Sequence, residues 1–204
     1  TATVDIDGNC LVTMQLSLHL DKEEENLYFP LPGTAANITI NGSSPSTTRS
    51  SSYVMVSLNK ITGGKAGDFT AQLSYTLPKI VVLSEDRKSL VLTLPILSGF
   101  SYPVSMLNYT ITLPDTIDTT PNFYSTYQQN GLASELNLLI NGNMITGSTK
   151  AGFNDHESVT MTLQSPFAMF PGVSTYLRDG NPELIPMGIF LGVALLYWLL
   201  FLRT

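Results

Sequence analysis

Residues 1–20 read TATVDIDGNCLVTMQLSLHL, and their pattern is the clearest indication of the fold class. Apolar and polar side chains alternate from Thr1 to Ile6 and again from Cys10 to Leu20. A period of two residues is typical of a strand that is buried on one face only. Asp7-Gly8-Asn9 joins the two runs with residues that tolerate a positive φ, as a tight hairpin requires. The stretch therefore predicts an antiparallel β-hairpin.

Similar runs continue to residue 164, separated by turn residues such as Gly63-Gly64 and Asn141-Gly142. Short strands spaced in this way favour an all-β fold, an antiparallel β-sandwich that is Ig-like in general style. We expect a solvated turn at the acidic residues 21–25 and an exposed loop at residues 41–52, which are rich in Gly, Ser and Thr. Beyond the hairpin, strands are expected at residues 27–31, 37–40, 54–58, 69–75, 80–83, 90–97, 106–113, 136–140, 144–145 and 159–163.

A new series of strand patterns begins after Gly99. We predict a first β-sandwich domain at residues 1–100 and a second, smaller β module at residues 101–164, with a single extended sandwich as the alternative. Residues 165–183 form a juxtamembrane segment whose aromatic and apolar residues show no clean period. This segment either packs against the β module or lies at the level of the lipid headgroups.

Residues 184–202 form an almost unbroken apolar run that is followed by Arg203. As a helix, the run would span roughly 28 Å, close to the ~30 Å hydrocarbon core of a bilayer. It predicts a single carboxyl-terminal transmembrane helix, and Arg203 favours a β-rich ectodomain outside the cytoplasm. The expected anchor residues are Leu184, Ile189, Phe190, Leu191, Leu195, Leu196, Trp198, Leu199, Leu200, Phe201 and Leu202.

Gly188 and Gly192 lie four residues apart within this run. On one face of a helix, such a pair lets two helices approach closely, so it is a candidate contact for homo-oligomers. We also expect that a signal peptide has been removed from a protein of this organisation. The predicted localisation is therefore the cell membrane, with a single pass and an extracytoplasmic ectodomain.

Acidic residues outnumber basic residues by 16 to 10, which gives a net charge of −6. This balance argues against nucleic acid and against anionic lipid as partners, because both would be repelled. Charged residues make up only 13% of the chain while Ser, Thr and Asn are abundant, as is typical of exported β proteins. The single cysteine, Cys10, cannot form an internal disulfide and is expected to be a small buried apolar group.

Reactive side chains are scarce, with two histidines and one cysteine, whereas zinc or nucleophile chemistry needs convergent His, Cys and carboxylate groups. Asp155-His156-Glu157 is the densest cluster, and we interpret it as a turn that enters a strand. Residues 5–9 resemble a calcium loop without its later bidentate carboxylate, so a hairpin turn is favoured. Asn37, Asn41 and Asn108 each begin an acceptor triplet for N-glycosylation. We predict no catalytic, cofactor-binding or metal-binding residues.

Four motifs carry a resemblance to a known family: Asp7-Gly8 before Val12-Thr13, a strand ending near Tyr75, residues 102–104 leading to residues 111–114, and residues 157–160 before Phe170-Pro171-Gly172. With these motifs the chain resembles bacterial predicted membrane proteins of unknown function. That family has a cleaved leader, an extracytoplasmic β-rich amino-terminal region and later transmembrane helices. Its pattern has an acidic residue and a tryptophan where this chain has Met14 and residues 92–95. The resemblance implies a membrane location and no catalytic residues.

Three functions fit these observations. The first is a non-catalytic β-sandwich ectodomain on a membrane anchor, which acts through a protein partner in the membrane or envelope. The second is a module that binds cell-wall glycan or another carbohydrate, for which exposed Tyr53, Tyr102, Tyr124 or Tyr127 would provide aromatic platforms. The third is an envelope hydrolase, which would need buried carboxylates facing each other in a cleft. We favour the first function and therefore predict that the protein is not an enzyme.

Overall fold

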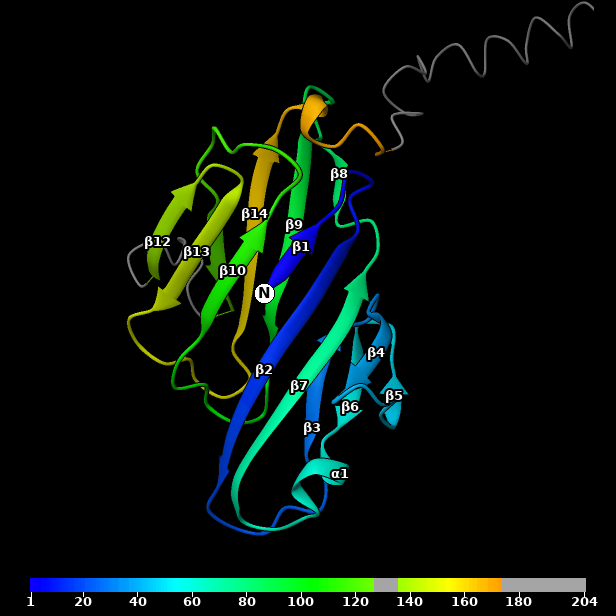
Figure 1. The fold of residues 1–204 in the computed structure, drawn as a ribbon, viewed down its shortest axis with the longest axis vertical. Coiled ribbons are helices and arrows are strands. Elements are labelled where there is room, and N and C mark those ends of the chain that lie inside the picture. Colours follow the sequence, from blue (N-terminus) through cyan, green and yellow to red (C-terminus); the bar gives the residue numbers. More distant parts are fainter. Residues whose placement is uncertain (127–135, 174–204) are drawn as a thin grey trace, which may run out of the picture.

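The computed structural model describes residues 1–126 and 136–173, and this part of the chain is almost entirely β-structure (Figure 1). The prediction of an all-β fold is confirmed. Between the strands lie one helical turn, α1 (Asn59–Thr62), and one 3-10 turn, η1 (Phe167–Met169). The strands of the described residues are β1 Ala2–Val4, β2 Cys10–Leu20, β3 Tyr28–Pro32, β4 Ala36–Ile40, β5 Thr47–Arg49, β6 Tyr53–Ser57, β7 Gly67–Leu77, β8 Val81–Leu83, β9 Leu90–Ser98, β10 Asn108–Thr112, β11 Asn122–Ser125, β12 Leu136–Asn141, β13 Met144–Thr149 and β14 Ser158–Ser165.

The predicted hairpin of residues 1–20 forms as β1 and β2, which pair antiparallel with Ala2 beside Val12. Its turn is fastened by Asp5, whose Oδ1 accepts hydrogen bonds from the backbone N–H groups of Asp7 (2.9 Å) and Asn9 (2.8 Å). Gly8 takes a φ of 75°, a left-handed conformation that glycine adopts without steric cost. The carboxylate of Asp5 therefore serves the turn, in agreement with the interpretation of residues 5–9 as a hairpin turn.

The largest sheet has seven strands in the order β12-β13-β10-β1-β2-β7-β4. Its longest pair is β2 and β7, which run antiparallel from Cys10 beside Leu77 to Leu20 beside Gly67. The neighbours β1 and β10 are parallel, with Ala2 beside Ile111. This pairing joins the amino-terminal strand to a strand more than a hundred residues later in the same sheet.

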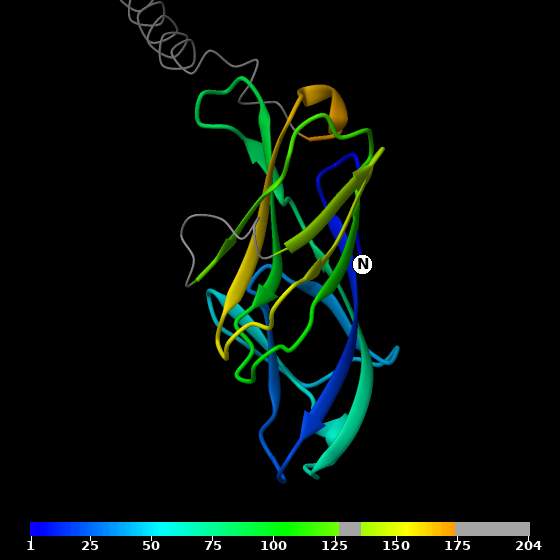
Figure 2. The same ribbon diagram turned by 90° about the vertical axis from the view of Figure 1, so that its left-hand side faces the viewer.

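A four-stranded sheet, β11-β14-β9-β8, and a three-stranded sheet, β3-β6-β5, face the seven-stranded sheet (Figure 2). Buried side chains of the three sheets, such as Leu73, Leu92 and Val54, belong to one hydrophobic core. Two ring contacts lie in this core. Tyr109 of β10 contacts Phe123 of β11 at a centroid distance of 5.5 Å, and Phe29 of β3 contacts Phe100, just after β9, at 5.1 Å. Burial of these inward faces is the main source of stability.

Strands from both sides of residue 100 pair with each other. In the seven-stranded sheet β1 lies beside β10, and in the four-stranded sheet β9 lies beside β14. Whether residues 1–100 and residues 101–164 fold as two separate units is not tested by this pairing, so the division into a domain and a smaller module stays a prediction.

Residues 41–52 differ from the exposed loop that was expected, because β5 forms within them. All three residues of β5 are exposed, so no burial pattern marks the strand. It is held by backbone pairing with β6, where Thr48 lies beside Met55. Arg49 also donates hydrogen bonds to the carbonyl oxygens of Gly33 (3.3 Å) and Ala35 (2.8 Å). Partner backbone groups, rather than apolar side chains, therefore order this segment.

Residues 166–173 turn back onto the β1–β2 hairpin, and we call them the strap. Phe170 is only 1% exposed and Met169 is also buried. The Gly172 N–H donates to the carbonyl oxygen of Ile6 at 3.0 Å. Of the two alternatives for the segment after residue 164, packing against the β-structure therefore holds for residues 166–173.

No helix within residues 1–126 and 136–173 is long and apolar enough to cross a membrane. The predicted anchor at residues 184–202, with Gly188 and Gly192, lies outside the described residues, as does most of the juxtamembrane segment.

Candidate functional site

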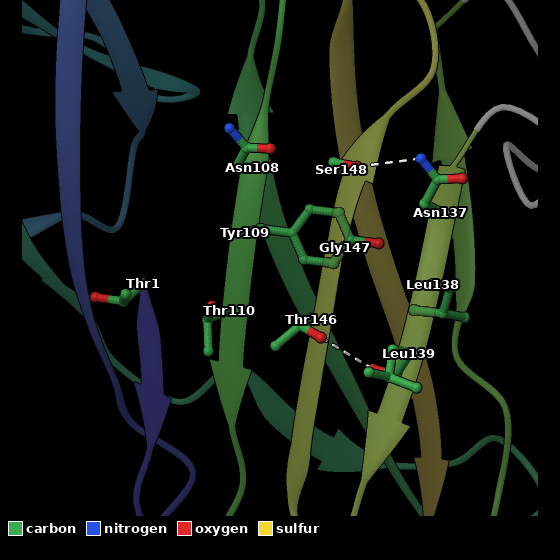
Figure 3. A pocket seen from close by; sticks show the side chains of 10 residues that line it. All are labelled: Thr1, Asn108, Tyr109, Thr110, Asn137, Leu138, Leu139, Thr146, Gly147 and Ser148. Carbon is green, nitrogen blue, oxygen red and sulfur yellow. Dashed lines mark hydrogen bonds between the residues drawn. The ribbon is translucent and has the colours of Figure 1, made fainter.

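A shallow hollow of about 590 Å³ lies over β10, β13 and β12 at one end of the seven-stranded sheet (Figure 3). Ten residues line it, and none of the ten carries a charged side chain: Thr1, Asn108, Tyr109, Thr110, Asn137, Leu138, Leu139, Thr146, Gly147 and Ser148. Most of its side chains end in a hydroxyl or an amide group.

The register of the three strands arranges the polar side chains in rows across the sheet. Asn108, Ser148 and Asn137 stand side by side in one row, and Asn137 Nδ2 donates a hydrogen bond to Ser148 Oγ at 3.2 Å. Two residues along, Thr110 and Thr146 stand beside Leu139. Because side chains alternate between the two faces of a strand, these residues share the solvent face. The hollow therefore offers hydroxyl and amide groups in a fixed array.

Beneath this array, Tyr109 and Gly147 are packed against each other. A Cβ atom at Gly147 would lie 2.3 Å from Tyr109 Oη and 2.6 Å from the carbonyl oxygen of Asn137. Tyr109 is 8% exposed, and among the described residues its hydroxyl has no hydrogen-bond partner. Burial raises the pKa of this hydroxyl to about 12, so it is neutral at physiological pH. Glycine at position 147 is thus a packing requirement for the ring under the hollow.

The polar surface continues along β2 and β7. Outward positions there pair Thr13 with Ser74, whose hydroxyl oxygens lie 3.3 Å apart, and Gln15 with Gln72. Within β2 and β7, the ionisable side chains that can carry charge near neutral pH are His19 and Asp68, which lie at the end of the pair near Leu20. Away from that end, the polar side chains of β2 and β7 on this face are neutral.

His19 forms a small charged cluster with Asp68 and Asp21 at that end of the β2–β7 pair. Its Nδ1 lies 2.6 Å from Asp68 Oδ1, and its Nε2 lies 3.3 Å from Asp21 Oδ1. The hydrogen bond and charge of Asp68, together with the charge of Asp21, raise the pKa of His19 above its ordinary value. All three side chains are largely exposed, so solvent screens their attraction.

Replacing Asp68 by asparagine is expected to lower the pKa of His19, because the main cause of the upward shift is removed. A raised folded-state pKa means that the cluster contributes stability below the unfolded-state pKa of about 6.5. This contribution disappears as the pH rises through the folded-state pKa. An NMR titration of the imidazole resonances measures the effect, with Asp86→Asn as the control. An unchanged His19 pKa in Asp68→Asn would contradict the assignment.

Asp155-His156-Glu157 forms the turn before β14, as predicted. Asp155 Oδ2 lies 3.3 Å from His156 Nδ1. The Glu157 side chain is buried and accepts a hydrogen bond from the Asn154 N–H at 3.0 Å. Within the described residues, no three His, Cys, Asp or Glu side chains are arranged to hold a metal ion.

The tyrosines named as sugar platforms do not gather at one place. Tyr53 is exposed on β6 and Tyr124 is exposed on β11, in different sheets. The Tyr102 hydroxyl donates to Glu24 Oε2 at 3.0 Å, and Tyr127 lies outside the described residues. Cys10 is buried, as expected, and burial raises the pKa of its thiol to about 12.

The hollow itself was not predicted from the sequence. One signal was available, since Asn108 and Thr110 occupy the outward positions of a strand pattern and belong to an acceptor triplet. Asn37, Asn41 and Asn108 are all exposed. The row of Asn108, Ser148 and Asn137 depends on strand pairing between distant segments, which alternation within one strand does not specify.

No protein-family model matches the chain, and a search of curated proteins finds no significant match either. The resemblance to bacterial predicted membrane proteins of unknown function stays a prediction.

Proposed function

We propose that the chain is the non-catalytic β-sandwich ectodomain of a membrane-anchored, extracytoplasmic protein, and that it acts by binding a protein of the membrane or envelope. The observation that carries this proposal is the hollow, because its fixed array of hydroxyl and amide groups is suited to recognition. The ten residues that line it include no His, Cys, Asp, Glu, Lys or Arg, the side chains that usually serve as general bases and metal ligands. The apolar residues 184–202 support the membrane location.

Within this proposal, the hollow is the contact surface for the partner. Neutral hydrogen-bonding groups lose less on desolvation than charged groups, so a partner with a neutral polar surface can cover them at moderate cost. Leu139 adds an apolar side chain that is 64% exposed at the same place. A mixed surface of this kind fits a weak or reversible protein contact.

The proposal is tested by passing envelope proteins in detergent over the immobilised full chain and over two variants. Asn108→Lys places a charge in the hollow, and Thr70→Lys places the same charge at an exposed position of β7 on the same sheet. We expect a retained protein to be lost with Asn108→Lys and kept with Thr70→Lys. Equal retention by both variants, or no retained protein at all, would contradict the proposed contact.

A second candidate function is the binding of a neutral glycan, and the hollow also supports it. Sugar hydroxyls are donors and acceptors like the Asn, Ser and Thr groups that line the hollow. Aromatic platforms are absent from its lining apart from the buried Tyr109, so binding would rest on hydrogen bonds. A rise in melting temperature with neutral cell-wall oligosaccharides, abolished in Asn108→Lys, would favour this candidate over a protein partner.

A further inference from the structure

The strap fixes the place where the chain leaves the described β-structure. Gly172 binds the backbone of Ile6, and a Cβ atom at Gly172 would lie 1.9 Å from Asp7 Oδ1. Val173 packs at Gly8, where an added Cβ atom would lie 3.1 Å from Val173 Cγ2 and 2.9 Å from Val81 Cβ. These contacts hold the chain at the β1–β2 turn, at the upper end of the molecule in Figure 1.

Exposed apolar side chains are found close to this exit point. Ile6 belongs to the β1–β2 turn and is 52% exposed, and Leu11 is the second residue of β2. Val82 lies on β8, directly after the segment in which the Ile80 N–H donates to the carbonyl oxygen of Gly8 at 2.8 Å. These three side chains belong to the elements at the end from which the chain leaves, where they are exposed and available for a contact.

The length of the remaining chain limits how the β-structure can be placed. Ten residues, 174–183, separate the strap from the apolar run that starts at Leu184. Fully extended, ten residues span at most about 36 Å. The eleven-residue strand β2 is itself about 37 Å long and ends near Lys22, at the opposite end of the molecule. A connection of this length is shorter than β2 alone, so it cannot run past the whole domain and bring the Lys22 end to the same surface.

The charges near the β1–β2 turn determine which kind of lipid surface this end of the domain can approach. The β8–β9 turn carries two acids and two bases, at residues 85–88, which cancel. Asp5 and Asp7 are opposed by Lys79 alone, so the turn region is slightly acidic. An anionic surface would be repelled, whereas a zwitterionic lipid surface would not.

We propose that the β1–β2 turn end of the domain faces the bilayer and contacts zwitterionic lipid headgroups through Ile6, Leu11 and Val82. This inference rests on the proposed membrane anchor. The strap then acts as a rigid mount, which holds the β1–β2 turn against the lipid and directs the Lys22 end away from it.

The test uses the full chain reconstituted in phosphatidylcholine vesicles, with a polarity-sensitive fluorophore attached to a cysteine introduced as Val82→Cys or, as the matched control, Lys22→Cys. The native Cys10 is buried, and unsubstituted protein shows that it stays unlabelled. We expect a blue shift and quenching by spin-labelled lipid at position 82, and neither effect at position 22. Equal signals at both positions in vesicle-bound protein would overturn the orientation.

A flotation assay after alkaline washing separates this result from a failure of the anchor. Protein that floats with the vesicles but shows no lipid contact at position 82 overturns the orientation alone. Protein that does not float overturns the proposed anchor and the orientation with it.

Discussion

Replacing Phe170 by alanine is expected to lower the free energy of unfolding by about 3–5 kcal/mol, the range for removing a buried aromatic ring. Phe170 is 1% exposed and belongs to the common hydrophobic core, although it lies outside any strand, after β14. The variant loses both the buried ring surface and the packing that holds the strap. Urea denaturation of the variant and the parent protein, followed by circular dichroism, measures the loss.

Met106→Ala is the matched control, because Met106 is 64% exposed and its truncation is expected to cost less than about 0.5 kcal/mol. Limited proteolysis separates the effect on the strap from the effect on the whole fold. We expect cleavage within residues 166–173 of Phe170→Ala at denaturant concentrations where the sheets still persist. A Phe170→Ala variant as stable as Met106→Ala would show that the strap is not part of the core.

The second large effect is expected for Gly147→Ala, with a loss of about 3 kcal/mol of folding stability. The new methyl group would meet Tyr109 Oη at 2.3 Å and the carbonyl oxygen of Asn137 at 2.6 Å. The ring and the neighbouring backbone of β12 must therefore both move. Thermal denaturation of the purified variant gives the loss.

Gly42→Ala provides the comparison, because Gly42 has a φ of 76° and nothing within 4 Å of an added Cβ atom. Its expected cost of about 1–2 kcal/mol comes from the left-handed backbone conformation alone. A larger loss at position 147 than at position 42 would mark packing under the hollow as the stronger constraint. If Gly147→Ala were tolerated without loss, the hollow would have an adaptable floor.

The strands with clear alternation were predictable because their buried positions are occupied by apolar residues at every second place in the sequence. In β2 and β7 the inward positions are apolar over eleven residues, and local pattern alone identifies both strands. β5 lacks any buried residue, and β11 is only four residues long, so neither carries such a pattern. Their existence depends on pairing with β6 and β14.

The candidate site was less predictable than the fold. Its rows join residues of β10, β13 and β12, and the register between β10 and β13 is a non-local property. The position of the strap was open for a related reason, since Phe170 and Met169 show no period that distinguishes a core contact from a lipid contact. The position of the strap is set by tertiary contacts, those of Gly172 with Ile6 and of Val173 with Gly8.

The parallel pairing of β1 with β10 has a consequence for the order of folding. On one side Ala2 lies beside Val12, but its neighbour on the other side is Ile111, so the centre of the seven-stranded sheet requires closure of a long loop. During synthesis, the β2–β7 pair can form long before β10 has left the ribosome, while one edge of β1 stays without its partner. Domains rich in such distant contacts fold slowly, and an unpaired strand edge is a site of aggregation. We therefore expect the nascent chain to depend on chaperones until residue 112 has emerged.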